Sequence, residues 1–159
     1  MSLKPTISIP SSHSSEASEN TQSLLGATSV VPNTDDLLFI GGHISDISEF
    51  DVVINCCAKV DCTSNNNVTH IHFADSGNVL QEEFMRKMEE GATRIEEALT
   101  AQQKVIVICF AGISRSVSMV CYWFITRRGL VYEDALELIQ SSREIADPNF
   151  TFGMYLSSL

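Results

Sequence analysis

Long apolar segments are missing from the sequence. The longest apolar stretches, around Val105–Phe110 and Val117–Ile125, are separated and interrupted by Gly, Ser and Arg, and neither approaches the roughly 18 residues that a membrane span requires. A secretory signal core is also missing, and the five cysteines are an odd count, which disfavours a disulfide framework. We therefore expect a soluble protein of a reducing compartment, the cytoplasm or also the nucleus, with no membrane partner.

Basic side chains are scarce. Ten Lys and Arg stand against twenty Asp and Glu, and the formal net charge is -10 at pH 7. Such a charge opposes extended contacts with nucleic acid or with an anionic membrane surface. An anion is therefore expected to bind only at one local site that is strong enough to overcome the field of the whole molecule.

The first 34 residues contain no aromatic side chain. They hold thirteen Ser or Thr and three of the four prolines, whereas all twelve aromatic residues lie between Phe39 and Tyr155. Such a composition cannot offset the entropy of ordering, so we predict a disordered Ser/Thr-rich tail over residues 1–34 and one folded domain over 35–159. A short strand at Ile7–Ile9, or a docking or phosphorylation segment, is the alternative.

The rest of the chain alternates short apolar runs with longer amphipathic segments. The predicted strands are Leu37–Ile40, Val52–Cys57, Ile71–Phe73 and Val105–Phe110, of which the second and last are nearly continuous apolar runs, typical of strands in a parallel sheet. Apolar spacings of three and four, with length and stop signals, predict helices near Leu80–Leu99, Ser114–Arg128, Glu133–Ser142 and Phe150–Leu156. The sequence therefore predicts an α/β fold with a central, largely parallel sheet flanked by helices.

The end of the last predicted strand carries the clearest chemical signal. The strand ends at Cys109, a five-residue loop with Gly112 follows, and Arg115 and Ser116 open a helix. The N–H groups of such a loop can converge on one point, at which the positive end of the helix dipole also points. Arg115 adds a planar fork for two phosphate oxygens. A thiol placed there loses its proton readily, so the same features predict Cys109 as a nucleophile.

This segment resembles the phosphate-binding loop of the cysteine-dependent protein phosphatases, specifically the dual-specificity group. The pattern of that group is His-Cys-x-x-Gly-x-x-Arg followed by Ser or Thr, and the resemblance extends over most of residues 35–156. It implies a protein tyrosine phosphatase-like fold. The residues to which the resemblance gives phosphate binding are Phe110, Ala111, Gly112, Ile113, Ser114 and Arg115.

The resemblance also implies the remaining catalytic roles. The stretch Ile71–Ser76 matches the segment that carries the general acid, which places this role on Asp75, 34 residues before Cys109. Ser116 matches a hydroxyl that stabilises the thiolate when the thiophosphate intermediate breaks down. One position departs from the family pattern: Ile108 stands where the family has a histidine that helps to favour the thiolate. Isoleucine donates no hydrogen bond, so catalytic power, but not the fold, is affected.

A dual-specificity protein phosphatase is the function that the resemblance implies. Its substrates would be proteins carrying phosphotyrosine and phosphoserine or phosphothreonine, and its chemistry needs no metal and no organic cofactor. The sequence gives no indication of the oligomeric state. Two alternatives stay open: a weakly active or inactive pseudophosphatase that binds phosphorylated partners, because of Ile108, and a rhodanese-like sulfurtransferase, which would leave Asp75 without a task.

Two pairs of histidine or cysteine side chains could in principle bind a metal or form a disulfide. His70 and His72 share one face of a strand, but no third metal ligand lies at a suitable spacing. Cys56 and Cys57 are adjacent, so at most one of them can face Cys109 and form a regulatory disulfide with it. We expect neither a metal site nor a structural disulfide.

Overall fold

A computed structural model describes residues 28–63, 65 and 67–159 of the chain. The strands are β1 (Ser29–Val30), β2 (Leu38–Gly41), β3 (Val52–Asn55), β4 (Val68–His70) and β5 (Val105–Ile108). The helices within the described residues are α2 (Gln81–Thr100), α3 (Arg115–Arg128), α4 (Tyr132–Gln140) and α5 (Phe150–Ser157). All four predicted helices are confirmed, and their ends differ from the predicted ones by no more than a few residues.

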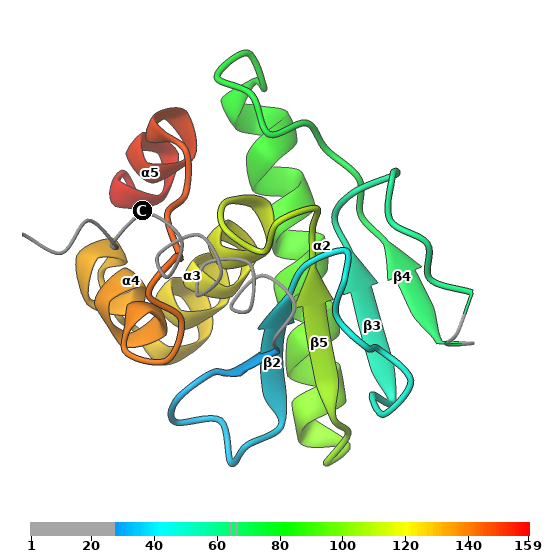
Figure 1. The fold of residues 1–159 in the computed structure, drawn as a ribbon. Helices are drawn as coiled ribbons and strands as arrows, with labels where there is room; N and C mark the ends of the chain where they lie inside the picture. The colour runs from blue at the N-terminus through cyan, green and yellow to red at the C-terminus, as the bar shows by residue number, and fades with distance from the viewer. Residues whose placement is uncertain (1–27, 64, 66) are drawn as a thin grey trace, which may run out of the picture.

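The five strands form one sheet in the order β1-β2-β5-β3-β4. β2, β5, β3 and β4 are parallel to their neighbours, and only β1 runs antiparallel, at the edge beside β2. β5 lies in the middle, where Ile108 is level with Gly41 on one side and Asn55 on the other. The predicted α/β fold with a largely parallel sheet is therefore confirmed, and Figure 1 shows α2 passing behind the strands.

The folded part of the chain begins earlier than residue 35. Ser29 and Val30 pair with Ile40 and Phe39 of β2, and Val31 is 1% exposed. Two paired residues are too few to give the periodic pattern by which a strand is recognised in a sequence, so the predicted boundary was placed too late. Residues 1–27 of the predicted tail, with the alternative strand at Ile7–Ile9, lie outside the described residues.

The third predicted strand is displaced. It was placed at Ile71–Phe73, whereas β4 covers Val68–His70. The backbone of the predicted segment still donates to β3 and the residue after it, from Ile71 N–H to Asn55 O and from Phe73 N–H to Cys56 O. The chain therefore leaves the sheet gradually and enters the loop that holds Asp75.

The hydrophobic core surrounds the two central strands and the first half of α3. β3 and β5 are fully buried along their whole length, and the first nine residues of α3 after Arg115 are buried as well. Since the hydrophobic surface of α3 is covered on nearly all sides, its first turn is held rigidly behind the end of β5. No helix in the described ranges is both long and apolar enough to cross a membrane.

Candidate active site

Cys109 lies directly after β5, in the loop that leads to α3. Its side chain is 2% exposed, and its Sγ accepts a hydrogen bond from the Gly112 N–H at 3.2 Å. The Ser116 hydroxyl oxygen lies 3.2 Å from the same sulfur. The sulfur therefore has two hydrogen-bonding neighbours, the Gly112 N–H and the Ser116 hydroxyl.

The loop needs glycine at position 112. Gly112 has φ of +68°, and a Cβ atom there would lie 2.8 Å from the Gly41 carbonyl oxygen. Its left-handed backbone turns the loop back over Cys109. The backbone N–H groups of Phe110, Ala111, Ile113 and Ser114 form no hydrogen bond with any other described residue, so they are available to an anion.

Arg143 holds this loop from behind, and no feature of the sequence pointed to it. It is 1% exposed, and its guanidinium donates to Gly112 O at 2.8 Å, Ala111 O at 3.3 Å and the Ser29 hydroxyl at 3.0 Å. In a trans peptide the N–H points away from the C=O, so the N–H groups of Gly112 and Ile113 are turned toward the site. Burial lowers the pKa of Arg143, while attraction to the Cys109 thiolate opposes this shift.

Arg115 offers a donor that has no partner. One of its terminal nitrogens donates to the Phe73 carbonyl at 3.3 Å, which fixes the direction of the guanidinium. Its Nε is buried and forms no hydrogen bond within the described residues. Buried polar atoms are nearly always paired in folded proteins. A phosphate oxygen bound over the loop would satisfy this atom.

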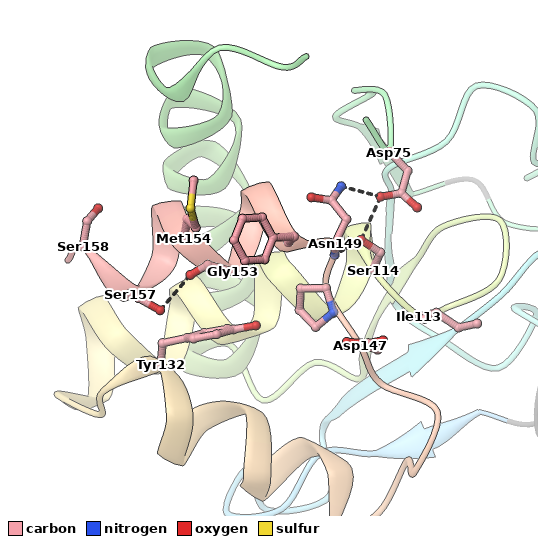
Figure 2. Close-up of a pocket in the computed structure, with 12 residues that line it drawn as sticks. Asp75, Ile113, Ser114, Tyr132, Asp147, Asn149, Gly153, Met154, Ser157 and Ser158 are labelled. Atoms are coloured by element: carbon pink, nitrogen blue, oxygen red, sulfur yellow. Dashed lines mark hydrogen bonds between the residues drawn. The ribbon is translucent and has the colours of Figure 1, made fainter. Parts of the chain in front are cut away.

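Asp75 is joined to the far end of the loop by a closed set of hydrogen bonds. Its Oδ1 accepts from the Ser114 hydroxyl and from the Asn149 side-chain amide, both at 2.8 Å. Asn149 N–H in turn donates to Ser114 Oγ at 2.9 Å, and Figure 2 shows the three side chains pointing toward one another. Oδ2 has no hydrogen-bond partner among the described residues, so this oxygen is free to hold or move a proton.

The loop that carries Asp75 is anchored on both sides. The Phe73 ring is 7% exposed and lies 5.7 Å from the Phe152 ring of α5, centroid to centroid. Beyond Asp75, the Val79 carbonyl accepts a hydrogen bond from the Tyr155 hydroxyl at 2.9 Å. These contacts hold the carboxyl group next to the phosphate loop without any contribution from a ligand.

Two cavities with different lining residues border this arrangement. The Asp75 cavity, of about 920 Å³, is lined by Asp75, Ile113, Ser114, Tyr132, Asp147, Pro148, Asn149, Phe150, Gly153, Met154, Ser157 and Ser158. The Arg115 cavity, of about 570 Å³, is lined by Cys57, Ala58, Lys59, His72, Phe73, Ala74, Phe110 and Arg115. The larger cavity is a groove beside α5 (Figure 2). The guanidinium that can bind an anion faces the smaller one.

The structure thus brings all the predicted site residues together. Gly112 and Ser116 contact the Cys109 sulfur, Ser114 donates to Asp75, and the Arg115 guanidinium donates to Phe73 in the segment that leads to Asp75. Asn149 belongs to the site as well. No role was predicted for Asn149 from the sequence, nor was its contact with Asp75.

Ile108 is fully buried at the end of β5. Its backbone carbonyl accepts a hydrogen bond from Cys56 N–H at 2.8 Å, but its side chain supplies no polar group beneath the nucleophile. The polar contacts that remain to the sulfur come from Gly112 and Ser116. Ile108 therefore gives Cys109 no hydrogen bond of the kind that the family histidine is expected to support.

The other candidate groups take separate places. All five cysteines are free, and the Cys56 sulfur lies 3.9 Å from the Met119 sulfur, whereas Cys57 lines the Arg115 cavity. Burial, followed by the nearby Cys109, raises the pKa of the Cys56 thiol. His70 Nδ1 and His72 Nε2 are 3.2 Å apart, and the described part of the chain contains no group of three His, Cys, Asp or Glu that could hold a metal ion.

Comparison with known sequences identifies relatives of one kind. The family model described as "Dual specificity phosphatase, catalytic domain" matches residues 40–158. The chain is 47% identical to mouse Dual specificity protein phosphatase 15 over 51 residues, which are 32% of this chain and 22% of that protein. It is 39% identical to Drosophila melanogaster Dual specificity protein phosphatase Mpk3 over 64 residues, 40% of this chain and 16% of that one. The chain spans about half the length or less of the curated relatives that it matches.

Comparison with solved structures gives the same picture of the fold. The crystal structure of DUSP15 matches with a TM-score of 0.70 and 25% identity, over 84% of this chain and 86% of that one. The crystal structure of human DUSP28 matches with a TM-score of 0.71 over 82% of this chain and 90% of that one. At 18% identity the second likeness concerns the fold alone.

Proposed function

Because the chain belongs to the family of dual specificity phosphatase catalytic domains, we propose that it removes phosphate from phosphotyrosine and from phosphoserine or phosphothreonine in proteins. One observation supports this most strongly. The Cys109 sulfur lies in a loop whose Phe110, Ala111, Ile113 and Ser114 N–H groups form no hydrogen bond within the described residues, and the buried Nε of Arg115, at the end of this loop, has no partner there either. A phosphate group placed there meets a nucleophile and the donors for its oxygens at the same time.

In the first step the Cys109 thiolate attacks phosphorus, and a sulfur–phosphorus bond forms while the bond to the substrate oxygen breaks. Arg115 and the loop amides hold the non-bridging oxygens as the charge redistributes. The leaving oxygen takes a proton from Asp75, whose Oδ2 is free of other partners. The products are the protein hydroxyl and a cysteinyl-phosphate.

In the second step a water molecule attacks the phosphorus of this intermediate. Asp75, now a carboxylate, accepts a proton from the water, and the sulfur–phosphorus bond breaks to release phosphate and the Cys109 thiolate. Ser116, whose hydroxyl lies 3.2 Å from the sulfur, stabilises the departing thiolate by donating a hydrogen bond. At the end of the cycle Asp75 is protonated again and Cys109 is again a thiolate, so the enzyme is ready for the next substrate.

The test is the turnover of p-nitrophenyl phosphate by Cys109→Ser. A serine hydroxyl is not ionised at neutral pH, so we expect the loss of more than about 99% of the activity with the fold preserved. Cys57→Ser is the matched control, because this second thiol lines the neighbouring cavity, and it should keep most of the activity. A Cys109→Ser variant that retained more than a few per cent of the turnover would remove Cys109 from the nucleophile role.

A second function, phosphoprotein binding without useful turnover, is favoured by Ile108. The absence of an imidazole beneath Cys109 weakens the stabilisation of the thiolate, while the anion-binding donors are unaffected. Wild-type protein of this kind would hydrolyse p-nitrophenyl phosphate at barely detectable rates and still retain phosphorylated proteins. A pull-down with Asp75→Ala, which should trap substrates of an active enzyme, against the wild type distinguishes the two functions.

A further inference from the structure

An aromatic ring projects from the phosphate loop beside the nucleophile. Phe110, the residue after Cys109, is 45% exposed and lines the Arg115 cavity. A half-exposed ring on the wall of a cavity offers a flat apolar surface that a ligand in the cavity can contact.

His43 fixes the Phe110 ring in place. The two rings are stacked with centroids 4.1 Å apart and planes inclined by 5°. The Phe110 carbonyl oxygen accepts a hydrogen bond from His43 N–H at 2.8 Å and lies 2.6 Å from His43 Nδ1. Because a carbonyl can only accept, the hydrogen in this contact is on Nδ1. These three contacts hold Phe110 against His43.

The stacking leaves one face of the Phe110 ring open. The imidazole covers the first face, and the ring still forms part of the wall of the Arg115 cavity. The other phenyl ring of the cavity, Phe73, is committed to the core, 6.2 Å from Phe84 and 5.7 Å from Phe152. Phe110 is therefore the aromatic surface of this cavity that a ligand can reach among the described residues.

We propose that Phe110, supported by His43, is a specificity-determining shelf that favours phosphotyrosine over phosphoserine and phosphothreonine. The inference rests on the proposed function and names the preferred substrate class. A phosphotyrosine held at the loop carries its ring at the level of Phe110, where the two rings can stack. Phosphoserine has one carbon between phosphate and backbone, so the same binding pose presses the peptide backbone against the exposed ring.

The proposal is tested with peptides of one sequence that differ only in carrying phosphotyrosine or phosphoserine. The quantity measured is the ratio of the two kcat/KM values. In Phe110→Leu, which keeps an apolar side chain without a ring, we expect this ratio to fall about 3- to 10-fold. In His43→Ala, where the ring stays but loses its support, it should fall about 2-fold, and Phe110→Tyr should restore the wild-type ratio.

Ile44→Ala is the matched control. Ile44 is 50% exposed and adjacent to His43 in the chain, but it does not line the Arg115 cavity, so its removal should leave the ratio unchanged. An equal fall in Ile44→Ala and His43→Ala would show that the effect is general loosening of this loop, and would overturn the shelf. Melting temperatures of all variants are compared to confirm that each is folded.

A binding measurement separates this inference from the proposed function. The dissociation constants of the two peptides are determined with Cys109→Ser alone and combined with Phe110→Leu. Wild-type protein that hydrolyses neither peptide would refute the proposed function, while a binding ratio lowered about 3-fold or more by Phe110→Leu would still support the shelf. Equal ratios with and without the ring, in turnover or, if there is none, in binding, would refute the shelf whatever the activity.

Discussion

The two sides of the phosphate loop differ in how their polar groups are satisfied. On the Asp75 side, the carboxyl oxygen Oδ1, the Ser114 hydroxyl and the Asn149 amide bind one another in a closed network. On the Arg115 side, the Nε of Arg115 has no partner, and Lys59 forms no ion pair or hydrogen bond within the described residues. One side is thus complete as it stands, and the other is complete only with an anion.

This difference fits the two tasks of the proposed function, proton transfer and anion binding. Proton transfer depends on the direction of a carboxyl group, and preformed hydrogen bonds fix that direction before the substrate arrives. Anion binding depends on donors that are held in position but not yet used. The net charge of -10 makes the second task local, because the rest of the surface repels a phosphate. The following substitutions separate the two sides.

The largest effect is expected on the anion side, from Arg115→Lys. Lysine keeps the positive charge but replaces the planar fork by a single point of donation. The loss of one donor to a transition-state oxyanion costs about 10²- to 10³-fold, and the fork supplies two, so kcat/KM for p-nitrophenyl phosphate should fall about 10⁴-fold. Steady-state kinetics of the variant measure this directly.

Lys59→Met provides the matched control for this prediction. It removes the other flexible cation of the same cavity without touching the loop, and it should lower kcat/KM for the same small substrate less than about 3-fold, because exposed charges are screened. Similar losses in the two variants would mean that the site needs only positive charge and no defined fork.

On the acid side, Asp75→Asn should slow the hydrolysis of a phosphopeptide by about 10²- to 10⁴-fold, the contribution of a general acid. The effect should be much smaller on p-nitrophenyl phosphate, whose leaving group departs as a stable anion without a proton. Asp147→Asn, a second exposed carboxyl of the same cavity, should change neither rate appreciably. Equal losses on both substrates would assign Asp75 a structural role.

Asn149→Ser sharpens this result, because it removes the amide that donates to Asp75 and keeps a side chain that can cap α5. The Asn149 oxygen accepts from Phe152 N–H at 3.0 Å, and serine is an equally good residue at this position. A lost hydrogen bond to a charged group predicts about a 10-fold slower phosphopeptide hydrolysis with little change in melting temperature. A fall in melting temperature without a change in rate would contradict the closed network.

The catalytic loop was predictable from the sequence because its parts are contiguous. A buried strand, a glycine turn and a helix start follow one another between Val105 and Ser116, so local patterns and the family resemblance place Cys109 and the N–H groups near it in one segment. Arg143 and Asn149 reach the same loop from 31 and 35 residues away. A tertiary contact of this kind leaves no periodic signal along the chain, and neither residue was assigned its role in advance.

The register of β4 shows a different limit. Ile71, His72 and Phe73 alternate between apolar and polar, whereas Thr69 and His70 in the observed strand are both polar, so the period of two favours the predicted segment over the observed one. What ends the ladder is the departure of the chain from β3 after His70, toward the Asp75 loop. Alternation identifies a strand here, but it cannot place the strand's ends.

The smallest effect on turnover is expected from a change at Ile108, the last residue of β5, directly before Cys109. In Ile108→His the imidazole lies next to Cys109 in the chain, and its protonated form would favour the thiolate. We expect iodoacetamide to alkylate Cys109 about 3- to 10-fold faster at pH 6, a shift of about 0.5 to 1 pK unit in the balance between thiol and thiolate, and p-nitrophenyl phosphate turnover to rise in step. The gain should shrink above pH 7, because an ordinary histidine loses its charge there.

Ile108→Leu controls for the change of shape at this fully buried position. It supplies no imidazole and should leave alkylation unchanged, so any common loss of melting temperature in the two variants reports packing alone. An imidazole without a partner in the core would lower the stability of Ile108→His further. If that variant is folded and both its alkylation and its turnover equal those of Ile108→Leu, thiolate stabilisation does not limit the enzyme, and the donors from Gly112 and Ser116 are sufficient.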